Sequence, residues 1–379
     1  MKKLLPEVCT IQYGFPFDSA KFSDSNGMPL IRIRDVVRGY SETYTTEEYK
    51  SEYIVHENDL LIGMDGEFNI AKWGKTPALL NQRVCRLAPN DSIDKDYLFY
   101  FMPIALKRIE EKTPFVTVKH LSAKELNKIE IPILPLEEQR KIAETLSKVD
   151  ELIAFRDRQL AKLDELVKAR FVEMFGNPIE NTMNWPKKLL RDITTKIGSG
   201  ATPKGGRESY PNAGVSLIRS MNVYDGQFLY KDLAHLTDEQ ATQLNGVTVE
   251  AEDVLVNITG ASVARSCVVP KDVLPARVNQ QVAIVRCNRE LLNPIFTNKM
   301  FINNEFKKAL LSIGESGGAT RQAITKKQLE ELSVVVPPLS IQNEFFTFSE
   351  CVDQQKQTVQ QSLDKLELMK KALMQEYFG

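Results

Sequence analysis

The feature that most constrains this chain is a long segment that occurs twice. The stretch 135–176 aligns without a gap, at a constant offset, with the stretch 338–379. Identical pairs are spread over the whole length and include Gln139/Gln342, Val149/Val352, Asp150/Asp353, Leu163/Leu366 and Phe175/Phe378. An internal repeat dictates architecture, and a period of about half the chain indicates a duplication and not a solenoid.

Each copy has the pattern of one long helix. Apolar residues recur at steps of three and four, as at Leu146, Val149 and Ile153. This narrow apolar seam with charged flanks is typical of a coiled coil. A proline precedes each copy and a glycine closes it, which is the expected punctuation of a helix. We therefore predict two long helices that pack on each other. Two unrelated helices on separate cores would leave the gapless match unexplained.

The globular parts before the two helices share one plan. Gly27-Met-Pro-Leu-Ile-Arg matches Gly214-Val-Ser-Leu-Ile-Arg, and Asn81-Gln-Arg-Val matches Asn279-Gln-Gln-Val. Short apolar runs at 29–34, 59–63 and 83–87 predict strands. Helices are expected at 97–110 and 121–126, the second capped by Ser122. The expected fold class is α/β (α+β), with two mixed domains in tandem at 1–134 and 177–337 and long helices at 135–176 and 338–379.

Composition limits the function. The 379 residues are enough for two to three domains, and the net charge is −1. A free-standing DNA-binding protein is usually basic, so a nucleic-acid role would rest on local patches or on a partner. The five cysteines are scattered without a CxxC, which predicts buried free thiols in a reducing compartment. Because no signal peptide or membrane span is evident, we expect a cytoplasmic protein.

One candidate binding surface lies in the second half, where residues 197–207 are rich in glycine. Hydroxyls, backbone amides and cations are the groups that hold phosphate oxygens. We expect a mobile loop here, and its candidate DNA-binding residues are Ser199, Thr202, Lys204 and Arg207. A solvated loop without a ligand is the alternative.

Other candidates follow the first predicted strand of each half or precede the long helices. Arginine and asparagine at such places can read guanine and adenine edges. The candidates are Arg32, Arg34 and Arg38 in the first half, Arg219 and Asn222 at the matching place, and Lys119, Arg321 and Gln322 farther along. Structural salt bridges to Asp35 are the alternative for the arginines.

Catalytic motifs are weak. Gly314-Glu-Ser-Gly-Gly fits the G-x-S-x-G pattern of hydrolases, but no histidine follows Ser316. The full G-x-x-x-x-G-K-[ST] pattern of a phosphate-binding loop is absent, and there is no cysteine–histidine cluster for zinc. We therefore expect no catalytic residue, no metal and no cofactor. By subtraction the chain is interpreted as a reader and a scaffold.

The junctions and helix ends resemble a known family. They are the runs Ile131-Pro-Ile-Leu-Pro-Leu-Glu-Glu-Gln-Arg-Lys-Ile, Val334-Val-Val-Pro-Pro-Leu-Ser-Ile-Gln, Phe171-Val-Glu-Met-Phe-Gly and Met374-Gln-Glu-Tyr-Phe-Gly. Together with the domain openings at Leu30 and Leu217, they resemble specificity subunits of type I restriction–modification systems. The resemblance covers essentially the whole chain.

The resemblance implies two target-recognition domains and an antiparallel pair of helices with pseudo-twofold symmetry. It implies a non-catalytic subunit that reads a bipartite, asymmetric target in double-stranded DNA. We expect words of about three to five base pairs and a spacer of roughly five to eight, with helix length as the ruler.

The implied partners are DNA methyltransferase subunits, two of them, and restriction/translocase subunits. Candidate partner contacts are Lys148, Glu151, Arg156 and Arg158. A merely solvated face is the alternative for these four residues. The alternative function is a coiled-coil interaction scaffold that does not read DNA.

Overall fold

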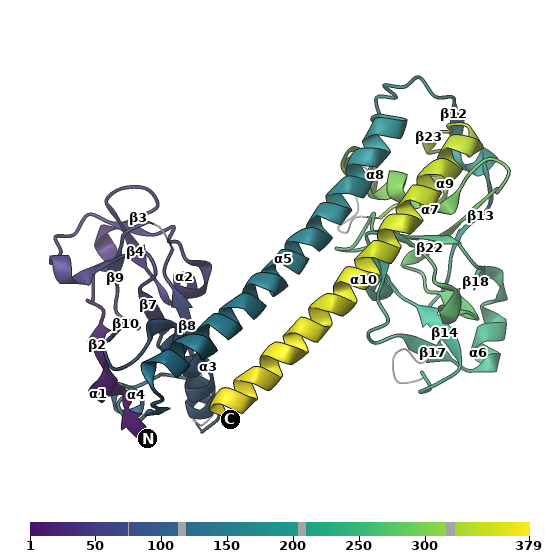
Figure 1. Cartoon of the computed structure of the whole chain (residues 1–379). Coiled ribbons are helices and arrows are strands. Elements are labelled where there is room, and N and C mark those ends of the chain that lie inside the picture. The colour runs from purple at the N-terminus through teal and green to yellow at the C-terminus, as the bar shows by residue number, and fades with distance from the viewer. Residues whose placement is uncertain (75, 113–118, 204–209, 316–322) are drawn as a thin grey trace. The chain divides into compact units, whose positions relative to one another are not determined.

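The computed structural model describes residues 1–74, 76–112, 119–203, 210–315 and 323–379 (Figure 1). They form two compact units, Met1–Asp157 with Gln361–Gly379, and Arg158–Gln360. Each unit therefore combines one mixed α/β domain with one half of each long helix, whereas the predicted domain bounds kept each helix whole. None of the described helices is long and apolar enough to span a membrane.

The first domain is built around two sheets. One has the order β2 (Cys9–Tyr13), β10 (Val84–Pro89), β7 (Leu60–Gly63) and β8 (Asn69–Lys72), all antiparallel. The other has the order β3 (Phe22–Ser23), β5 (Tyr44–Thr45), β4 (Met28–Ile31), β9 (Ala78–Leu80) and β6 (Ile54–Val55), in which β4 and β9 run parallel. Strand β1 (Lys2–Leu4) pairs with β11 (Glu130–Pro132) just before the first long helix. The helices are α1 (Leu5–Val8), α2 (Ile33–Arg38), α3 (Lys95–Lys112) and α4 (Ala123–Leu126).

The second domain repeats both sheets in the same order, without a counterpart of the edge strand β3. They are β13 (Thr194–Ser199), β22 (Val282–Cys287), β19 (Val254–Asn257) and β20 (Ser266–Val268), and then β17 (Ala234–Leu236), β14 (Val215–Ile218), β21 (Ala276–Val278) and β18 (Thr248–Val249). Strand β12 (Lys187–Leu189) pairs with β23 (Ser333–Val335), as β1 does with β11. The hairpin β15 (Val223–Tyr224) and β16 (Gln227–Phe228) is an addition. The helices are α6 (Asp238–Gln243), α7 (Pro294–Ile302), α8 (Asn304–Glu315) and α9 (Lys326–Glu330).

Glycines explain part of the sequence match between the domains. Gly27 and Gly214, just before β4 and β14, have φ values of +99° and +141°, which glycine adopts at little cost. Gly14 and Gly200 instead lie against backbone, because an added Cβ would come within 2.0 Å and 1.6 Å of a carbonyl oxygen. The same close approaches therefore require the same residue in both copies.

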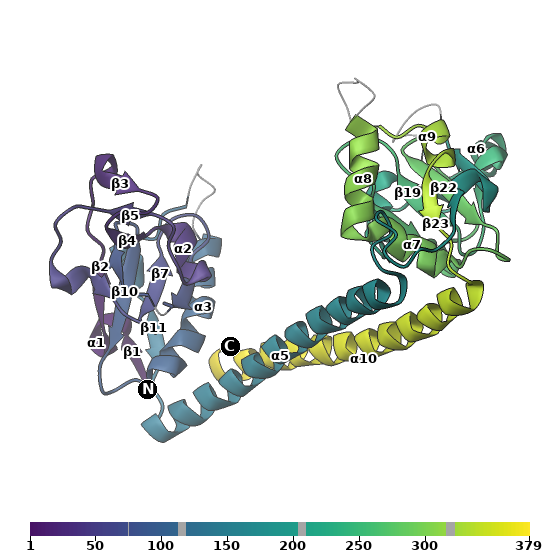
Figure 2. The same ribbon diagram turned by 90° about the horizontal axis from the view of Figure 1, so that it is seen from above.

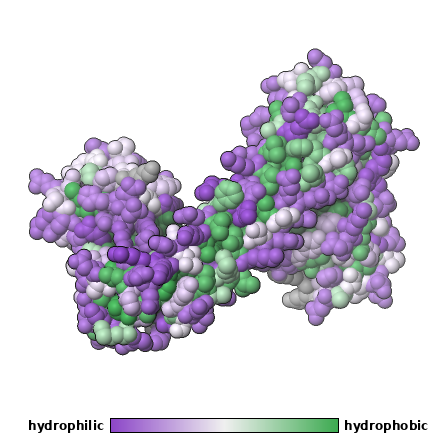
Figure 3. All heavy atoms as spheres, in the orientation of Figure 1, coloured by the Kyte–Doolittle hydropathy of each residue, from purple (hydrophilic) through white to green (hydrophobic). Residues whose placement is uncertain are grey.

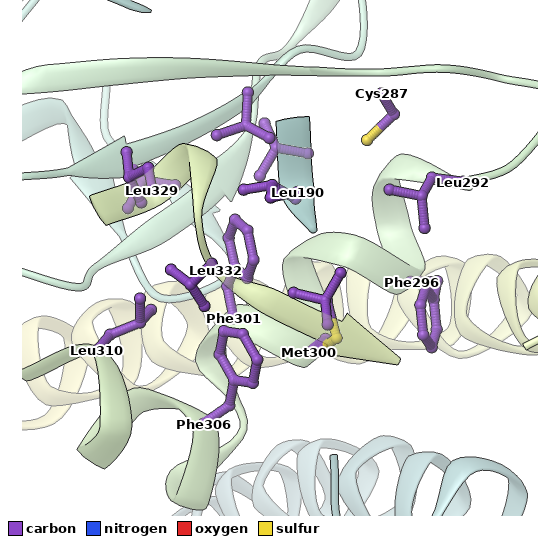
Figure 4. Close-up of a cluster of buried hydrophobic side chains, with 14 of the residues drawn as sticks. Leu190, Cys287, Leu292, Phe296, Met300, Phe301, Phe306, Leu310, Leu329 and Leu332 are labelled. Atoms are coloured by element: carbon purple, nitrogen blue, oxygen red, sulfur yellow. The ribbon is translucent and has the colours of Figure 1, made fainter. Parts of the chain in front are cut away.

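Each domain has one large core that reaches the long helices. In the second domain, α7 supplies Phe296, Met300 and Phe301, and Leu310 of α8 packs with them (Figure 4). In the first domain, α3 supplies Tyr97, Leu98 and Phe101 to the equivalent core. Aromatic side chains bury large areas, so α3 and α7 contribute much of the apolar surface of the two domain cores.

Most predicted elements are present, with three corrections. The strand predicted at 29–34 ends at Ile31, because Arg32 is the N-cap of α2. The start of the predicted loop at 197–207 lies in strand β13. Cys351 is exposed, whereas the other four cysteines are buried free thiols as expected. The N-cap role of Ser122 is confirmed, since its Oγ accepts from Glu125 N at 3.2 Å.

The long helices are α5 (Leu136–Phe175) and α10 (Leu339–Phe378), each preceded by a proline and followed by a glycine. Gly176 has a φ of +71°, which ends α5 in the left-handed region that glycine favours. In the first unit, Lys370 contacts Asp150 at 2.6 Å, and in the second, Lys356 contacts Asp164 at 2.6 Å. Residue numbers rise on one helix as they fall on the other, so the predicted antiparallel pairing is confirmed.

A buried glutamine anchors the start of each long helix. Gln139 accepts a hydrogen bond from Asp94 N at 2.8 Å and donates to Leu134 O at 2.8 Å. Gln342 accepts from Asn293 N at 2.9 Å and donates to Pro337 O at 2.7 Å. Both side chains are fully buried. Each glutamine therefore ties its helix to the N-terminal cap of the large domain helix, α3 or α7.

A phenylalanine anchors the end of each long helix in the other domain's core. Phe175 of α5 packs on Phe296 of α7 with ring centroids 4.7 Å apart. Phe378 of α10 packs on Tyr97 of α3 at 5.2 Å. Each domain core thus holds the start of one long helix and the end of the other.

Candidate nucleic-acid interface

Of the three predicted arginines of the first domain, Arg34 and Arg38 lie in α2 and Arg32 is its N-cap. This helix packs against β7 and β8 (Figure 2). The backbone N–H of Arg32 donates to Asp35 Oδ2 at 2.9 Å, so a buried carboxylate holds the start of the helix. Arg34 Nε lies 3.7 Å from the same carboxylate, and Arg38 pairs with Glu42 at 3.6 Å. All three arginine side chains are nevertheless exposed to solvent. Salt bridging to Asp35, the alternative, therefore holds for Arg34 without removing it from the surface.

The matching place in the second domain is a single 3-10 turn, Ser220–Asn222. Asn222 is fully buried: its amide donates to Leu229 O and Lys231 O, and its Oδ1 accepts from Arg219 N. Its side chain therefore stabilises the turn as Asp35 does in the first domain. The DNA-reading role expected for Asn222 does not fit this position, because a base could not reach the amide.

Arg219 remains at the edge of the surface. Its Nη2 donates to Asp232 O, and its guanidinium lies 6.0 Å from the ring of Tyr210. The side chain is half-buried. An arginine oriented in this way has donors left for a ligand, since the guanidinium carries five N–H groups.

The remaining predicted residues have different surroundings. Lys119 is drawn inward, because its Nζ donates to Glu110 O at 2.9 Å at the end of α3. Ser199 is the exposed last residue of β13, and Thr202 is also exposed. Four candidates, Lys204, Arg207, Arg321 and Gln322, lie outside the described residues, as does Ser316.

Two cations were missed in the sequence. Arg265, just before β20, stacks on the ring of Tyr224 in β15, with its guanidinium 4.2 Å from the ring centroid. Arg83, just before β10, is half-exposed and lies beside an aspartate and a histidine from two other segments. The sequence did hold a signal for Arg83. The matching motifs Asn81-Gln-Arg-Val and Asn279-Gln-Gln-Val differ only at this position, where the second domain has Gln281.

The predicted partner-contact residues lie on α5. Lys148, Glu151 and Arg158 are exposed, whereas Arg156 donates from Nε to Ser362 Oγ of α10 at 3.2 Å. Exposed apolar side chains accompany them, as the hydrophobic patches along the long helices in Figure 3 show. They include Leu152, Phe155, Leu166, Val172, Leu368 and Met369.

A shallow cavity of about 390 Å³ lies between α5 and α10 in the first unit. Its lining is mixed: Ile153 and Met374 are apolar, and Asp150, Lys370 and Lys371 are charged. Within the described residues, no group of three or more histidine, cysteine, aspartate or glutamate side chains is placed to hold a metal ion.

Comparison with known proteins gives the family. The family model for the type I restriction modification DNA specificity domain matches residues 1–165 and 183–368. The type I restriction enzyme EcoBI specificity subunit of Escherichia coli is 29% identical over 93% of this chain and 80% of its own length. A putative MjaX specificity subunit of Methanocaldococcus jannaschii is 24% identical over 93% of this chain and 86% of its own length.

Solved structures agree on the fold. The S subunit of the type I system of M. genitalium has a TM-score of 0.60 at 15% identity and covers all of this chain and 96% of its own. A chain from a structure of type I R-M complex assembly has a TM-score of 0.59 at 17% identity, over all of this chain and 97% of its own. Members of the family are specificity subunits, which recognise DNA, and catalysis belongs to other subunits of the complex. The chain belongs to the type I restriction–modification DNA specificity family.

Proposed function

We propose that this chain reads a bipartite, asymmetric target in double-stranded DNA for a type I restriction–modification complex. One observation carries the proposal: apart from the edge strand β3, the two domains have the same strand order in both sheets but different side chains around them. Where the first domain has a helix with Arg34 and Arg38, the second has a 3-10 turn with Met221 and buried Asn222. A shared scaffold with divergent surface segments favours two readers of two different words.

The long helices are proposed to set the distance between the two words. Each has 40 residues and so is about 60 Å long at ~1.5 Å per residue. We propose words of about three to five base pairs and a spacer of roughly five to eight, since half-site spacing follows reader spacing. Both long helices contribute residues to both units, which supports this role.

The proposed protein partners are two DNA methyltransferase subunits and restriction/translocase subunits in the cytoplasm. Exposed charged and apolar residues alternate on α5, with Lys148 and Glu151 near Leu152 and Phe155. Such a surface is suited to a protein contact more than to water alone. The net charge of −1 fits a subunit whose partners supply much of the phosphate binding.

The test is to co-express the chain with the methyltransferase subunit that is encoded next to it. N6-methyladenine is then mapped over the host genome by single-molecule sequencing. We expect methylation in a split, asymmetric motif with a constant gap. Active methyltransferase without such a motif would contradict the proposal and favour the interaction scaffold. Salt-dependent binding of the purified complex to duplex DNA provides a second, independent measurement.

A further inference from the structure

Three segments of the first domain meet at one end of its four-stranded sheet. Asp65 follows β7, Arg83 precedes β10, and His120 precedes α4. Backbone hydrogen bonds join the segments, from Met64 N to Arg83 O at 2.9 Å and from Leu121 N to Met64 O at 2.7 Å. Asp65 and His120 also form an antiparallel bridge. The three side chains therefore project from a backbone that is held on both sides.

The side chains form one polar group. Arg83 Nε lies 3.7 Å from Asp65 Oδ2, and Arg83 Nη1 lies 3.1 Å from His120 Nδ1. His120 Nδ1 also faces Asp65 Oδ1, and because a carboxylate only accepts, that ring nitrogen carries the hydrogen. The other ring nitrogen, Nε2, is then the acceptor for Arg83 Nη1, at 3.4 Å. Asp65 is mostly buried, whereas Arg83 and His120 are 52% and 46% exposed. Among the described residues, the contacts of this guanidinium use Nε and one hydrogen of Nη1, which leaves the second hydrogen of Nη1 and both hydrogens of Nη2 for a ligand.

The backbone at Arg83 is unusual. Its φ is +69°, in the left-handed region that is strained for a residue with a side chain. Glycine or asparagine would suit the turn better. Strain of this kind is often found at functional sites, where the function requires a particular side chain at the strained position.

The second domain has the same backbone and different chemistry. Thr259 and Ala323 form the bridge that Asp65 and His120 form in the first domain. Gln281 precedes β22 as Arg83 precedes β10, and its Oε1 accepts from Ser220 Oγ at 3.0 Å. Gln281 does not appear among the residues with positive φ. The charged group and the strained turn therefore belong to the first domain, and an uncharged amide stands in their place in the second.

We propose that Arg83 reads a guanine in the DNA word of the first domain and that Asp65 and His120 are positioning residues for it. A guanidinium presents parallel donors that match the O6 and N7 acceptors of guanine in the major groove. The neighbouring carboxylate weakens attraction for a phosphate but holds the planar fork in one orientation, as base readout needs. This inference rests on the proposed function, because it assigns one base pair within one of the two words.

The experiment compares methylation motifs of complexes that contain the full chain or its variants. Arg83→Gly removes the guanidinium and suits the positive φ, so the turn is kept. Arg83→Lys keeps the charge without the fork. Lys128→Gln, at the exposed turn before β11, is the matched control for loss of one cation from the same domain. For each complex, affinity is also measured for the motif duplex and for duplexes with one base pair changed.

We expect both Arg83 variants to accept any base at one G·C pair of one word, with the other word and the spacer unchanged. The preference for guanine there should fall by about 5- to 150-fold, which corresponds to ~1–3 kcal/mol. Asp65→Asn and His120→Gln should relax the same pair partly, whereas a purely structural role would change thermal stability and not base preference. Lys128→Gln should retain the wild-type motif.

Three results separate the ideas. A split motif for the wild type that stays unchanged in Arg83→Gly would overturn this inference and leave the proposed function intact. The absence of a split motif for the wild type would contradict the proposed function itself. If Arg83→Gly weakens all duplexes equally, Arg83 binds a phosphate and the assignment to a base is wrong.

Discussion

Both domains contain an aspartate–arginine pair at the same place, but only the carboxylate of the second domain is deeply buried. In the second domain, Arg286 contacts both oxygens of Asp253 at 2.8 and 2.9 Å, and this carboxylate is 1% exposed. The carboxylate also raises the pKa of Arg286 by hydrogen bonding. In the first domain, Arg86 contacts Asp59 at 3.0 Å, and that carboxylate is 26% exposed. A buried charge left without its partner is costly, whereas an exposed one is screened by water.

The same substitution in the two domains should therefore have unequal effects. Arg286→Met leaves the buried carboxylate of Asp253 without its partner and should lower the free energy of unfolding by about 3 kcal/mol, whereas Arg86→Met leaves the more exposed Asp59 and should cost ~1 kcal/mol or less. Urea unfolding followed by circular dichroism measures both. Equal losses would mean that exposure does not control the strength of these two pairs.

Cysteine reactivity should separate one thiol from the other four. Burial raises the pKa of Cys9, Cys85 and Cys267 to about 12 and that of Cys287 to about 11. At pH 8 these thiols are protonated as well as inaccessible, while Cys351 is exposed. Iodoacetamide should modify the native chain once, at Cys351, and the urea-unfolded chain five times, as read by mass spectrometry.

The thiols also give a stability effect with a definite sign. A thiol whose pKa is raised on folding stays neutral in the native chain while the unfolded thiol ionises above its usual value of 9.0. Stability should thus be unaffected by these groups below about pH 8 and should fall as the pH rises through 9 to 11. A stability that stays constant over this range would contradict the burial of the four thiols.

At the scale of elements, the two glutamines at the helix starts are the sharpest repeated feature. Gln139→Ala would leave the backbone N–H of Asp94 and the carbonyl of Leu134 without their partner inside the protein. We expect a loss of about 2–3 kcal/mol, since each buried polar group left unpaired costs ~1–3 kcal/mol. Gln342→Ala should cost a similar amount in the second unit.

The control is a solvent-facing glutamine on α10, the helix that carries Gln342. Gln357→Ala should change stability by less than about 0.5 kcal/mol. Thermal unfolding by calorimetry can compare the three variants. If Gln342→Ala and Gln357→Ala have the same effect, the buried hydrogen bonds do not anchor α10.

The elements that could be predicted are those whose signals are local. Pro135 and Gly176 mark the ends of α5 in the sequence, and apolar spacing marks the seam, so this helix is predicted to within one residue at each end. The parallel pairing of β4 with β9 joins residues about fifty positions apart and has no local signal. This pairing, and that of β14 with β21 in the second domain, lies in a second sheet. Prediction of single strands could not reveal that each domain has two sheets.

The candidate site was less predictable than the fold. Asn222 has the right residue type for adenine recognition, but it is buried as a capping residue, like Asp35 at the equivalent position. Arg83 was overlooked because its partners, Asp65 and His120, are distant in sequence. Residue type shows what a side chain can bind, whereas exposure and neighbours decide whether it is available.

At the scale of the whole molecule, the repeat makes helix length adjustable without disturbing either domain. The boundary between the two units crosses α5 after Asp157 and α10 after Gln360. Duplicating 151–157 and 354–360 adds one heptad to each helix at that boundary and keeps the apolar seam in phase. Each helix becomes longer by about 10 Å at ~1.5 Å per residue.

If the helices are the ruler, this double insertion should lengthen the spacer by two to three base pairs at about 3.4 Å per pair, and both words should stay the same. Three further pairs rotate the DNA by roughly 100°, while a heptad returns the helix seam to the same face. The DNA must twist or bend to present both words, so methylation should also be slower than in the wild type. Insertion in α5 alone should instead disrupt the pairing and lower stability. A methylated motif with the original spacer in the double insertion would show that something other than helix length sets the gap.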